Sequence, residues 1–451
     1  MFKLPKLTKK ERAWVLYDIA NSAFVLTVIT VLFPILYETV FAQAEGIAHL
    51  DKVIEVNGVK EANAAYGDVW ARGSQIFKYL TSGIALTVAI LSPIMGSWSN
   101  YAGNKKKFFK LFLLMAIIGG FGLAIPGLSW VVLLVIFTIS SIGYNLTNVV
   151  YDAFLVDVTG EETMDEISAQ GFAWGYIGSL IPFFIGIIPY ALATFGMIPE
   201  EFVTLTISFA FVVSLVWWWI YSQPILNDVE QTYSIDQTEN SLGKSFKRLW
   251  VTLKEIRSFK YIFIFLIAYL LYIDVVNSVI RLAVNIGSDL FVSAPVMLGV
   301  IVMVQIIAFP SAIIYGRLTK KHGGKKMIYY GIFIYAIGVY VVTLIQADST
   351  YLMWVVGALI GTAQGGIQSV SRSYFAKMVP YEKANDFFGF FSVFGRFGGI
   401  ISPFIIAYFS GRMETGVNGA VMLLLIPLVI ASILLLFVHP PRNEEIHTSE
   451  Q

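Results

Sequence analysis

Hydrophobic residues occur in long runs along this chain, and short polar intervals separate them. A helix needs about 20 mostly apolar residues to cross the hydrocarbon core of a membrane. Transmembrane strands would instead give alternating segments of about 10 residues. The runs of sufficient length are 13–37, 74–98, 107–125, 129–151, 168–193, 202–221, 260–283, 295–315, 327–346, 351–372, 386–409 and 416–438. The pattern therefore predicts twelve transmembrane helices.

Composition leads to the same class. Of the 451 residues, 57% are hydrophobic and 14% are charged, whereas soluble domains carry about a quarter charged residues. The chain has no cysteine, and its four histidines lie in polar stretches, so we expect no disulfide, no metal site and no cofactor. A net charge of +1 gives no reason to expect a nucleic-acid partner. These totals favour an all-α membrane protein that is not an enzyme.

The first run resembles a secretory signal because basic residues precede it and Ala42-Gln43-Ala44 resembles a cleavage site. The run is longer than the usual 7–15 residues of a signal peptide, and Asp18 lies near its start. We therefore expect a retained helix.

Basic residues predict the orientation in the membrane. With twelve spans both termini share one side, and 24 of the 31 Lys and Arg residues lie on that side, against 6 on the other. The positive-inside rule places both termini in the cytoplasm of a bacterial-type cytoplasmic membrane.

The polar interval 222–259 divides the spans six and six. We expect bundles over 1–221 and 260–438, a cytoplasmic linker between them, and a tail over 439–451. Leu242-Gly243-Lys244-Ser245 resembles the end of a phosphate-binding loop, but Thr238 stands where that loop requires glycine. The interval is therefore interpreted as a solvated linker with a basic amphipathic piece, and an ATP-driven pump is excluded within this chain.

The two halves repeat each other. Residues 96–106 match 316–326 at an offset of 220, and a second set of matches around the fourth and fifth spans of each half has an offset of 221. The matched pairs include Gly96/Gly316, Gly103/Gly323, Phe154/Phe375 and Pro182/Pro403. Parallel repeats of this kind are typical of transporters, with a substrate site where the halves meet. We therefore predict two pseudo-symmetric six-helix bundles.

These repeated residues carry a resemblance. The element G-x-x-x-N/K-x-x-G-x-K-K, after the second and eighth spans, is similar to a loop signature of the major facilitator superfamily. Residues 14–24, 151–155, 171–178 and 371–375 resemble the autophagy-linked vacuolar effluxer family and its bacterial relatives. The resemblance implies the major facilitator fold and solute transport, with amino-acid efflux proposed for the fungal members. Its usual loop aspartate is Asn100 or Lys320 here, so no charge relay through that acid is carried over.

The four loop glycines are predicted to pack helices tightly at a gate rather than to bind substrate. They are Gly96, Gly103, Gly316 and Gly323. Gly171, Gly175 and Gly178 on the fifth helix are interpreted as helix-packing residues as well. The alternative for that helix is a substrate-facing aromatic wall built from Trp174 and Tyr176.

Polar side chains inside the spans are candidates for function, because lipid disfavours them. They gather on the first, fourth, seventh and tenth helices, and the resemblance implies that these same helices line the central cavity. The first and seventh spans both contain D-x-x-N-S. Candidate substrate-binding residues are Asn21, Asn145, Asn148, Asn277, Gln364, Gln368 and Arg396.

Charged residues within the spans suggest coupling and gating. Asp274 is the first candidate for a proton-coupling group, and a structural ion pair with Arg281 or Arg396 is the equal alternative. Asp18 is the second candidate, and we expect it at the inner gate, paired with Arg372 or with a basic loop residue. Its alternative is an interfacial, solvated carboxylate.

Asp152 is a further gate candidate. Arg396 needs an anionic partner, which is either a substrate carboxylate or phosphate, or Asp274. In the outer loop 38–73, Val56-Asn57-Gly58-Val59 predicts a small hairpin, which is either a lid or an assembly surface.

The sequence thus favours a monomeric secondary transporter that uses alternating access, with a small polar solute, a proton and the lipid bilayer as partners. An amino acid or a related metabolite is the expected solute. A lipid or amphiphile transporter on the same fold is the alternative, and a solute-sensing receptor ranks below both.

Overall fold

The structure is a computed structural model, and nearly all of its described residues are helical. It describes residues 6–47, 53–56, 59–62, 64–234, 259–289, 294–345, 351–397, 401–410, 412–413 and 416–439. Most of the expected linker, from 235 to 258, and the tail after 439 lie outside the described residues. The roles assigned to them therefore stay predictions.

The first half of the chain forms helices that match the first six hydrophobic runs. The first span is continuous and consists of α1 (Lys9–Phe24), a π-helical segment η1 (Val25–Leu32) and α2 (Phe33–Ala44). The other spans are α3 (Ala64–Ser99), α4 (Asn104–Leu123), α5 (Trp130–Ala153), α7 (Glu161–Thr194) and α8 (Val203–Asp228). The short helices α6 (Leu155–Val158) and η2 (Glu200–Phe202) complete this half.

The second half forms the remaining spans. Four are α10 (Lys260–Asp289), α11 (Ala294–His322), α12 (Gly324–Val342) and α13 (Leu352–Met378), and the short helix η3 (Tyr381–Lys383) follows α13. The last two spans each consist of two helices, which are α14 (Ala384–Phe397) with α15 (Ile401–Ser410), and α16 (Gly416–Met422) with α17 (Leu425–Leu436).

Nine helical segments of the described chain are individually long and apolar enough to cross a membrane. Together with the shorter pieces they form the predicted twelve-helix membrane fold. Local sequence determines where several of these helices begin. Thr8 and Glu11 form a reciprocal capping box at α1, and Ser129 accepts a hydrogen bond from the Val132 amide at α5.

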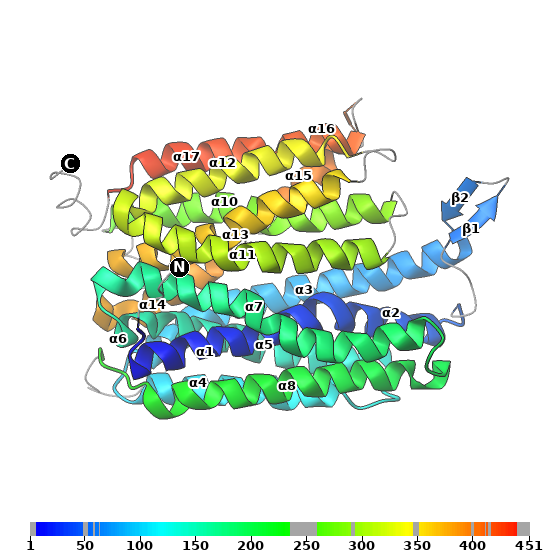
Figure 1. The fold of residues 1–451 in the computed structure, drawn as a ribbon, viewed down its shortest axis with the longest axis horizontal. Coiled ribbons are helices and arrows are strands. Elements are labelled where there is room, and N and C mark those ends of the chain that lie inside the picture. The colour runs from blue at the N-terminus through cyan, green and yellow to red at the C-terminus, as the bar shows by residue number, and fades with distance from the viewer. Residues whose placement is uncertain are drawn as a thin grey trace.

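The long helices run side by side, with α1 to α8 on one side of the molecule and α10 to α13 and α15 to α17 on the other, while α14 lies beside α3 among the helices of the first half (Figure 1). The start of α1 and the end of α17 lie at the same end of the bundle, which we name the terminal face. The opposite end is the far face. There β1 (Val53–Val56) and β2 (Val59–Ala62) form an antiparallel hairpin beyond α3. Val56 pairs with Val59, which confirms the predicted hairpin.

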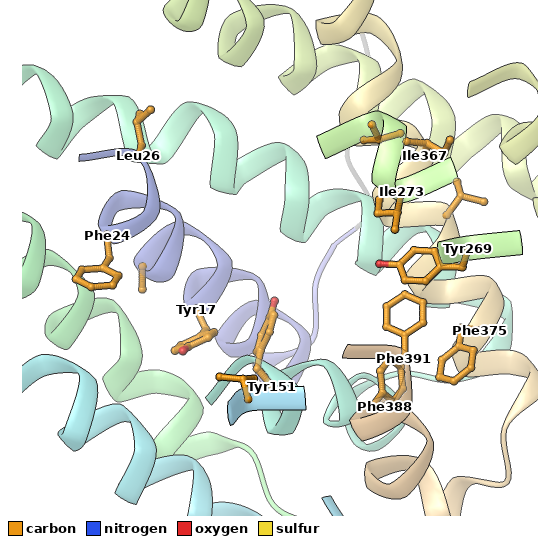
Figure 2. Close-up of a cluster of buried hydrophobic side chains, with 14 of the residues drawn as sticks. Tyr17, Phe24, Leu26, Tyr151, Tyr269, Ile273, Ile367, Phe375, Phe388 and Phe391 are labelled. Atoms are coloured by element: carbon orange, nitrogen blue, oxygen red, sulfur yellow. The ribbon is translucent and has the colours of Figure 1, made fainter. Parts of the chain in front are cut away.

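Apolar side chains are arranged as a membrane protein requires. Inside, aromatic rings fill the space between helices, as for Tyr17 and Tyr151 in one group and Tyr269, Phe375 and Phe391 in another (Figure 2). Outside, α4, α12 and α17 expose many large apolar side chains. Water does not favour an apolar surface of this extent, whereas lipid does.

Candidate functional site: the Arg372 cluster and its neighbouring amides

Arg372 on α13 joins the two halves of the molecule near the terminal face. Its Nε donates to the Ser168 hydroxyl at 3.0 Å and one terminal nitrogen donates to Asp152 at 3.1 Å. The other terminal nitrogen donates to Asp18 at 3.1 Å and to the Ser168 carbonyl at 3.0 Å. Asp18, Asp152 and Ser168 lie on α1, α5 and α7. We name these four residues the Arg372 cluster; it connects three helices of the first half to one of the second.

Aromatic rings lie close to the guanidinium. Its carbon lies 4.5 Å from the Trp14 ring and 4.2 Å from the Phe172 ring, so cation–π attraction adds to the ion pairs. The side chain of Arg372 is 4% exposed, that of Asp18 is 9% exposed and that of Asp152 is 25% exposed. Asp152 is therefore the member of the cluster that is most open to its surroundings.

Gly171 makes room for this cluster. A Cβ atom at Gly171 would lie 2.3 Å from the Asp18 carboxylate and 3.1 Å from the Arg372 guanidinium. Gly175 and Gly178 approach Ser22 and Ile19 of α1 in the same way. The described contacts thus match the helix-packing interpretation of the three glycines.

Other polar contacts between the halves surround the cluster. Ser168 Oγ donates to the Ser369 carbonyl at 2.8 Å, and Lys377 forms an ion pair with Asp165. These contacts join α7 to α13 at the end of the molecule where the termini lie.

Tyr381 also reaches across the halves at the terminal face. It lies in η3 and donates to Glu161 at 2.8 Å. Burial and the nearby Glu161 carboxylate raise the pKa of Tyr381 above its ordinary value, so its hydroxyl keeps its proton and remains a donor.

Two of the repeated loop glycines lie where the halves meet. A Cβ at Gly96 on α3 would come within 2.4 Å of the Asn385 carbonyl on α14, and one at Gly316 on α11 would come within 2.4 Å of the Ala169 Cβ on α7. The same repeated position therefore makes a close inter-half contact in both halves. Packing of this closeness is possible only without a side chain.

The other two loop glycines serve a different purpose. Gly103 has a φ of 74° and nothing within 4 Å of a Cβ, and Gly323 has a φ of 82°. A positive φ favours glycine because other residues are strained there. The expectation that Gly103 packs a helix at a gate is therefore wrong, and both residues form the turn into the next helix.

Asp274 on α10 is fully buried, and its carboxylate lies at the amino end of α15. Its carboxylate accepts hydrogen bonds from the amide of Ile401 at 3.1 Å and from the amide of Ser402 at 2.7 Å, and the Ser402 hydroxyl donates to it as well. The first amides of a helix have no partner within it and favour a negative charge. Asp274 thus anchors the second piece of the eleventh span, a role that the sequence did not suggest.

The neutral polar candidates fall into two described contacts. Asn21 on α1 donates to Asn148 on α5 at 3.2 Å. Tyr176 on α7 donates to Gln368 on α13 at 3.0 Å, and this second bond joins the two halves. Thus α1, α5, α7 and α13 all contribute uncharged polar groups close to the Arg372 cluster.

The remaining candidates are distributed on the same helices. Asn145 is buried on α5, whereas Asn277 on α10 and Gln364 on α13 are partly buried. Arg396 lies on α14 and Arg281 on α10, but their side chains are outside the described residues. The pairing of Asp274 with either arginine therefore stays a prediction.

Sequence reasoning missed Ser168, Trp14 and Phe172 as partners of Arg372. Ser168 was assigned only to the start of a span. Trp14 and Phe172 stood within the segments that carry the family resemblance, but their ring character alone indicated packing. The available signal was a buried arginine, which requires several acceptors and a covering surface.

Fold comparison places the chain among known transporters. The structure superposes on the human organic anion transporter MFSD10 with a TM-score of 0.66 at 11% sequence identity, covering 95% of this chain and 100% of that one. A bacterial homologue of the iron transporter ferroportin gives a TM-score of 0.63 at 14% identity, with 95% and 99% covered. These likenesses establish the fold. The fold is that of the major facilitator superfamily.

Sequence comparison identifies the family. The model of the vacuole effluxer Atg22-like family matches residues 7–445, and the chain belongs to this family. The MFS-type transporter YxiO of Bacillus subtilis is 39% identical in an alignment of 452 residues, which covers 99% of this chain and 98% of that protein. Autophagy-related protein 22 of Kluyveromyces lactis is 22% identical, with 95% and 93% covered. Both the resemblance and the predicted fold class are confirmed.

Proposed function

We propose that the chain moves a small polar solute by alternating access, and that the Arg372 cluster is the gate at the terminal face. The observation that carries this proposal is the guanidinium that joins α1, α5 and α7 to α13. Any opening between the halves at this face has to break those bonds. The described structure then represents the state in which this face is closed.

The energetics of the cluster suit a contact that forms and breaks in every cycle. Removing one partner from a buried ion pair is costly, about 3–5 kcal/mol, whereas the net value of the complete pair is small because burial desolvates both charges. The complete cluster therefore need not trap the closed state. An incomplete cluster would strongly disfavour it.

We propose that the solute is an amino acid or a related metabolite. The polar groups beside the cluster are uncharged amides and a phenol (Asn21, Asn148, Gln368 and Tyr176), which suit hydrogen-bonding or zwitterionic molecules better than lipids. Asn145, Asn277 and Gln364 are proposed to contribute, and Arg396 is proposed to bind a substrate carboxylate. The family description, a vacuole effluxer, supports export.

We propose proton coupling at the cluster. Two carboxylates, Asp18 and Asp152, meet one guanidinium, and a proton on one carboxylate would balance the charge of the closed gate. Asp274 was the first candidate from sequence. Its three described donors and its position at the start of α15 support an anchoring role instead.

The basic residues near the terminal face support its placement in the cytoplasm. We further propose that the protein acts as a monomer in a bacterial-type cytoplasmic membrane. The Bacillus subtilis relative supports such a membrane.

Flux measurements test the function. Purified protein in proteoliposomes should take up radiolabelled amino acids, and a pH gradient should drive accumulation. We expect Asp152→Asn and Asp18→Asn to lose accumulation but keep counterflow. Asp228→Asn is the matched control, because Asp228 pairs only at the surface, with the exposed Lys9.

Each result has a distinct consequence. Binding without flux would instead favour a receptor. Flux of lipid probes without flux of amino acids would favour the lipid transporter. Accumulation that survives in both Asp18→Asn and Asp152→Asn but fails in Asp274→Asn would return the coupling role to Asp274.

A further inference from the structure

The chain segment that follows α8 is fixed to the first half of the molecule. Val229 is fully buried, and the backbone amides of Thr232 and Tyr233 donate to Asp157 at 2.8 and 3.0 Å. The Gln231 side chain accepts a hydrogen bond from the Lys105 amide at 3.3 Å. Sequence alone assigned these residues to a solvated linker. We name residues 229–234 the strap.

A buried ion pair holds the residue to which the strap binds. Lys105 and Asp157 are 2.5 Å apart and both side chains are 0% exposed, and the Lys105 ammonium also donates to the Ala153 carbonyl. Such a pair gives little net stability, because both charges are desolvated. Its effect is positional: it leaves one Asp157 oxygen directed to the two strap amides.

The strap supports a residue of the first half that forms hydrogen bonds with α14. Gln231 donates to the carbonyls of Ser99 and Asn100 at 3.2 and 3.1 Å. The Asn100 side chain in turn accepts hydrogen bonds from the backbone and side-chain nitrogens of Asn385, at 3.2 and 2.9 Å. Asn100 and Asn385 are both buried.

The strap also contacts the second half directly. The Tyr233 ring lies 5.2 Å from the Tyr381 ring with an interplanar angle of 61°, an edge-to-face contact. Tyr381 is therefore held between Tyr233 and Glu161, to which it donates. The strap thus acts on two residues near the start of α14: it contacts Tyr381 in η3 directly, and it supports Asn100, which binds Asn385 four residues further on.

The repeated lysine of the second half has a comparable position. Lys325 donates to the carbonyls of Leu436 and Val438, at 3.1 and 3.0 Å, where α17 ends. In each half this lysine therefore fixes the chain that leaves the last helix. Only after α8 does that chain continue to a described contact with the opposite half, through Tyr233.

We propose that the strap is a part of the gate: Gln231 and Tyr233 are positioning residues that stabilise the closed terminal face by holding Asn100 and Tyr381 against the start of α14. This inference rests on the proposed alternating access. It predicts that any movement of α14 away from α3 separates Tyr381 from Tyr233.

Distance measurement between spin labels tests the strap without any substrate. The chain has no cysteine, so Lys107→Cys on α4 and Lys321→Cys on α11, both exposed positions, give one label on each half. Tyr233→Ala removes the edge-to-face contact with Tyr381, and the free energy of such a contact should lower the ratio of closed to open molecules about two- to tenfold. Tyr233→Phe, which keeps the ring, should restore the ratio.

Gln231→Ala provides a second variant, with Gln223→Ala as its matched control because the partly buried Gln223, as far as the described residues show, donates to the Trp219 carbonyl of its own helix. If the ratio of closed to open molecules falls in Gln231→Ala but not in Tyr233→Ala, the role of Gln231 in supporting Asn100 is upheld and the role of Tyr233 is overturned. If the ratio of closed to open molecules is unchanged in both strap variants but shifts in Arg372→Ala, the role of the strap is overturned and the gate proposal stands. A single distance in every protein, Arg372→Ala included, would instead contradict alternating access itself.

Discussion

Asp18 and Asp274 stand in the same short sequence, D-x-x-N-S, yet their surroundings differ. Asp18 lies on α1 and binds Arg372 on the opposite half. Asp274 lies on α10 and binds the amino end of α15, within its own half. In the proposed cycle, one carboxylate therefore connects parts that separate during transport, and the other connects parts that stay together. A local motif does not determine which of these roles a buried acid takes, because the partner comes from a distant helix.

The largest effect is expected when the cation that binds Asp18 is removed. Arg372→Ala leaves the buried Asp18 and the partly buried Asp152 without their guanidinium, and we expect the closed terminal face to lose about 3–5 kcal/mol. Spin-label distances across the terminal face should shift to the open population. Arg372→Lys keeps the positive charge and should recover part of the loss. The recovery should be incomplete, because lysine cannot bind both acids in a fixed planar geometry. A closed population that is unchanged in Arg372→Ala would contradict the gate.

Asp274→Ala should act on stability rather than on gating. Each helix amide that loses its acceptor costs roughly 1–3 kcal/mol, so the Tm of the purified protein should fall clearly. The ratio of closed to open molecules should change little. Ser402→Ala, which keeps the carboxylate, should show a smaller fall in Tm. An Asp274→Ala protein with normal Tm and altered gating would remove the distinction between the two acids.

Gly171→Ala sharpens the comparison from the other side. The new methyl group would meet the Asp18 carboxylate at 2.3 Å, and such overpacking costs about 1–3 kcal/mol. We expect a weaker closed state with little change at the start of α15. Gly160→Ala is the control, since nothing lies within 4 Å of its Cβ. Equal effects of both substitutions would show that contact with Asp18 is not responsible.

The smallest effect is expected at the asparagines of the two motifs. Asn21→Ala removes the bond to Asn148, worth about 0.5–1.5 kcal/mol, and should also raise the KM for the transported solute. Asn277→Ala lies on α10 and should change stability less. Isothermal titration and flux assays together distinguish the two variants. A stronger effect of Asn277→Ala on solute affinity would move the substrate site toward α10.

Much of the architecture follows from the sequence. Twenty-residue apolar runs leave few alternatives to transmembrane helices, because lipid offers no hydrogen bonds to an open backbone. The repeat at offset 220 also located the close contacts at Gly96 and Gly316, since glycine at a helix surface permits close approach. The prediction that Asp18 meets Arg372 agrees with the geometry, although the gating role of the pair stays a proposal.

Other features depend on packing that no local pattern encodes. The eleventh hydrophobic run gives no sign that its second helix begins at Ile401 and uses Asp274 as its anchor. Residues 229–234 are polar enough to suggest a solvated linker, yet Asp157 and Lys105 hold them. In both places a buried charge from a distant span determines the structure, and pairing across more than seventy residues is invisible to periodicity.

The hairpin formed by β1 and β2 offers an experimental handle on topology. It lies beyond the amino end of α3, away from the helical bundle, at the far face (Figure 1). A short epitope inserted between the two strands would leave every inter-helix contact untouched. Antibody labelling of intact cells would then report directly whether this ribbon is displayed outside the cell.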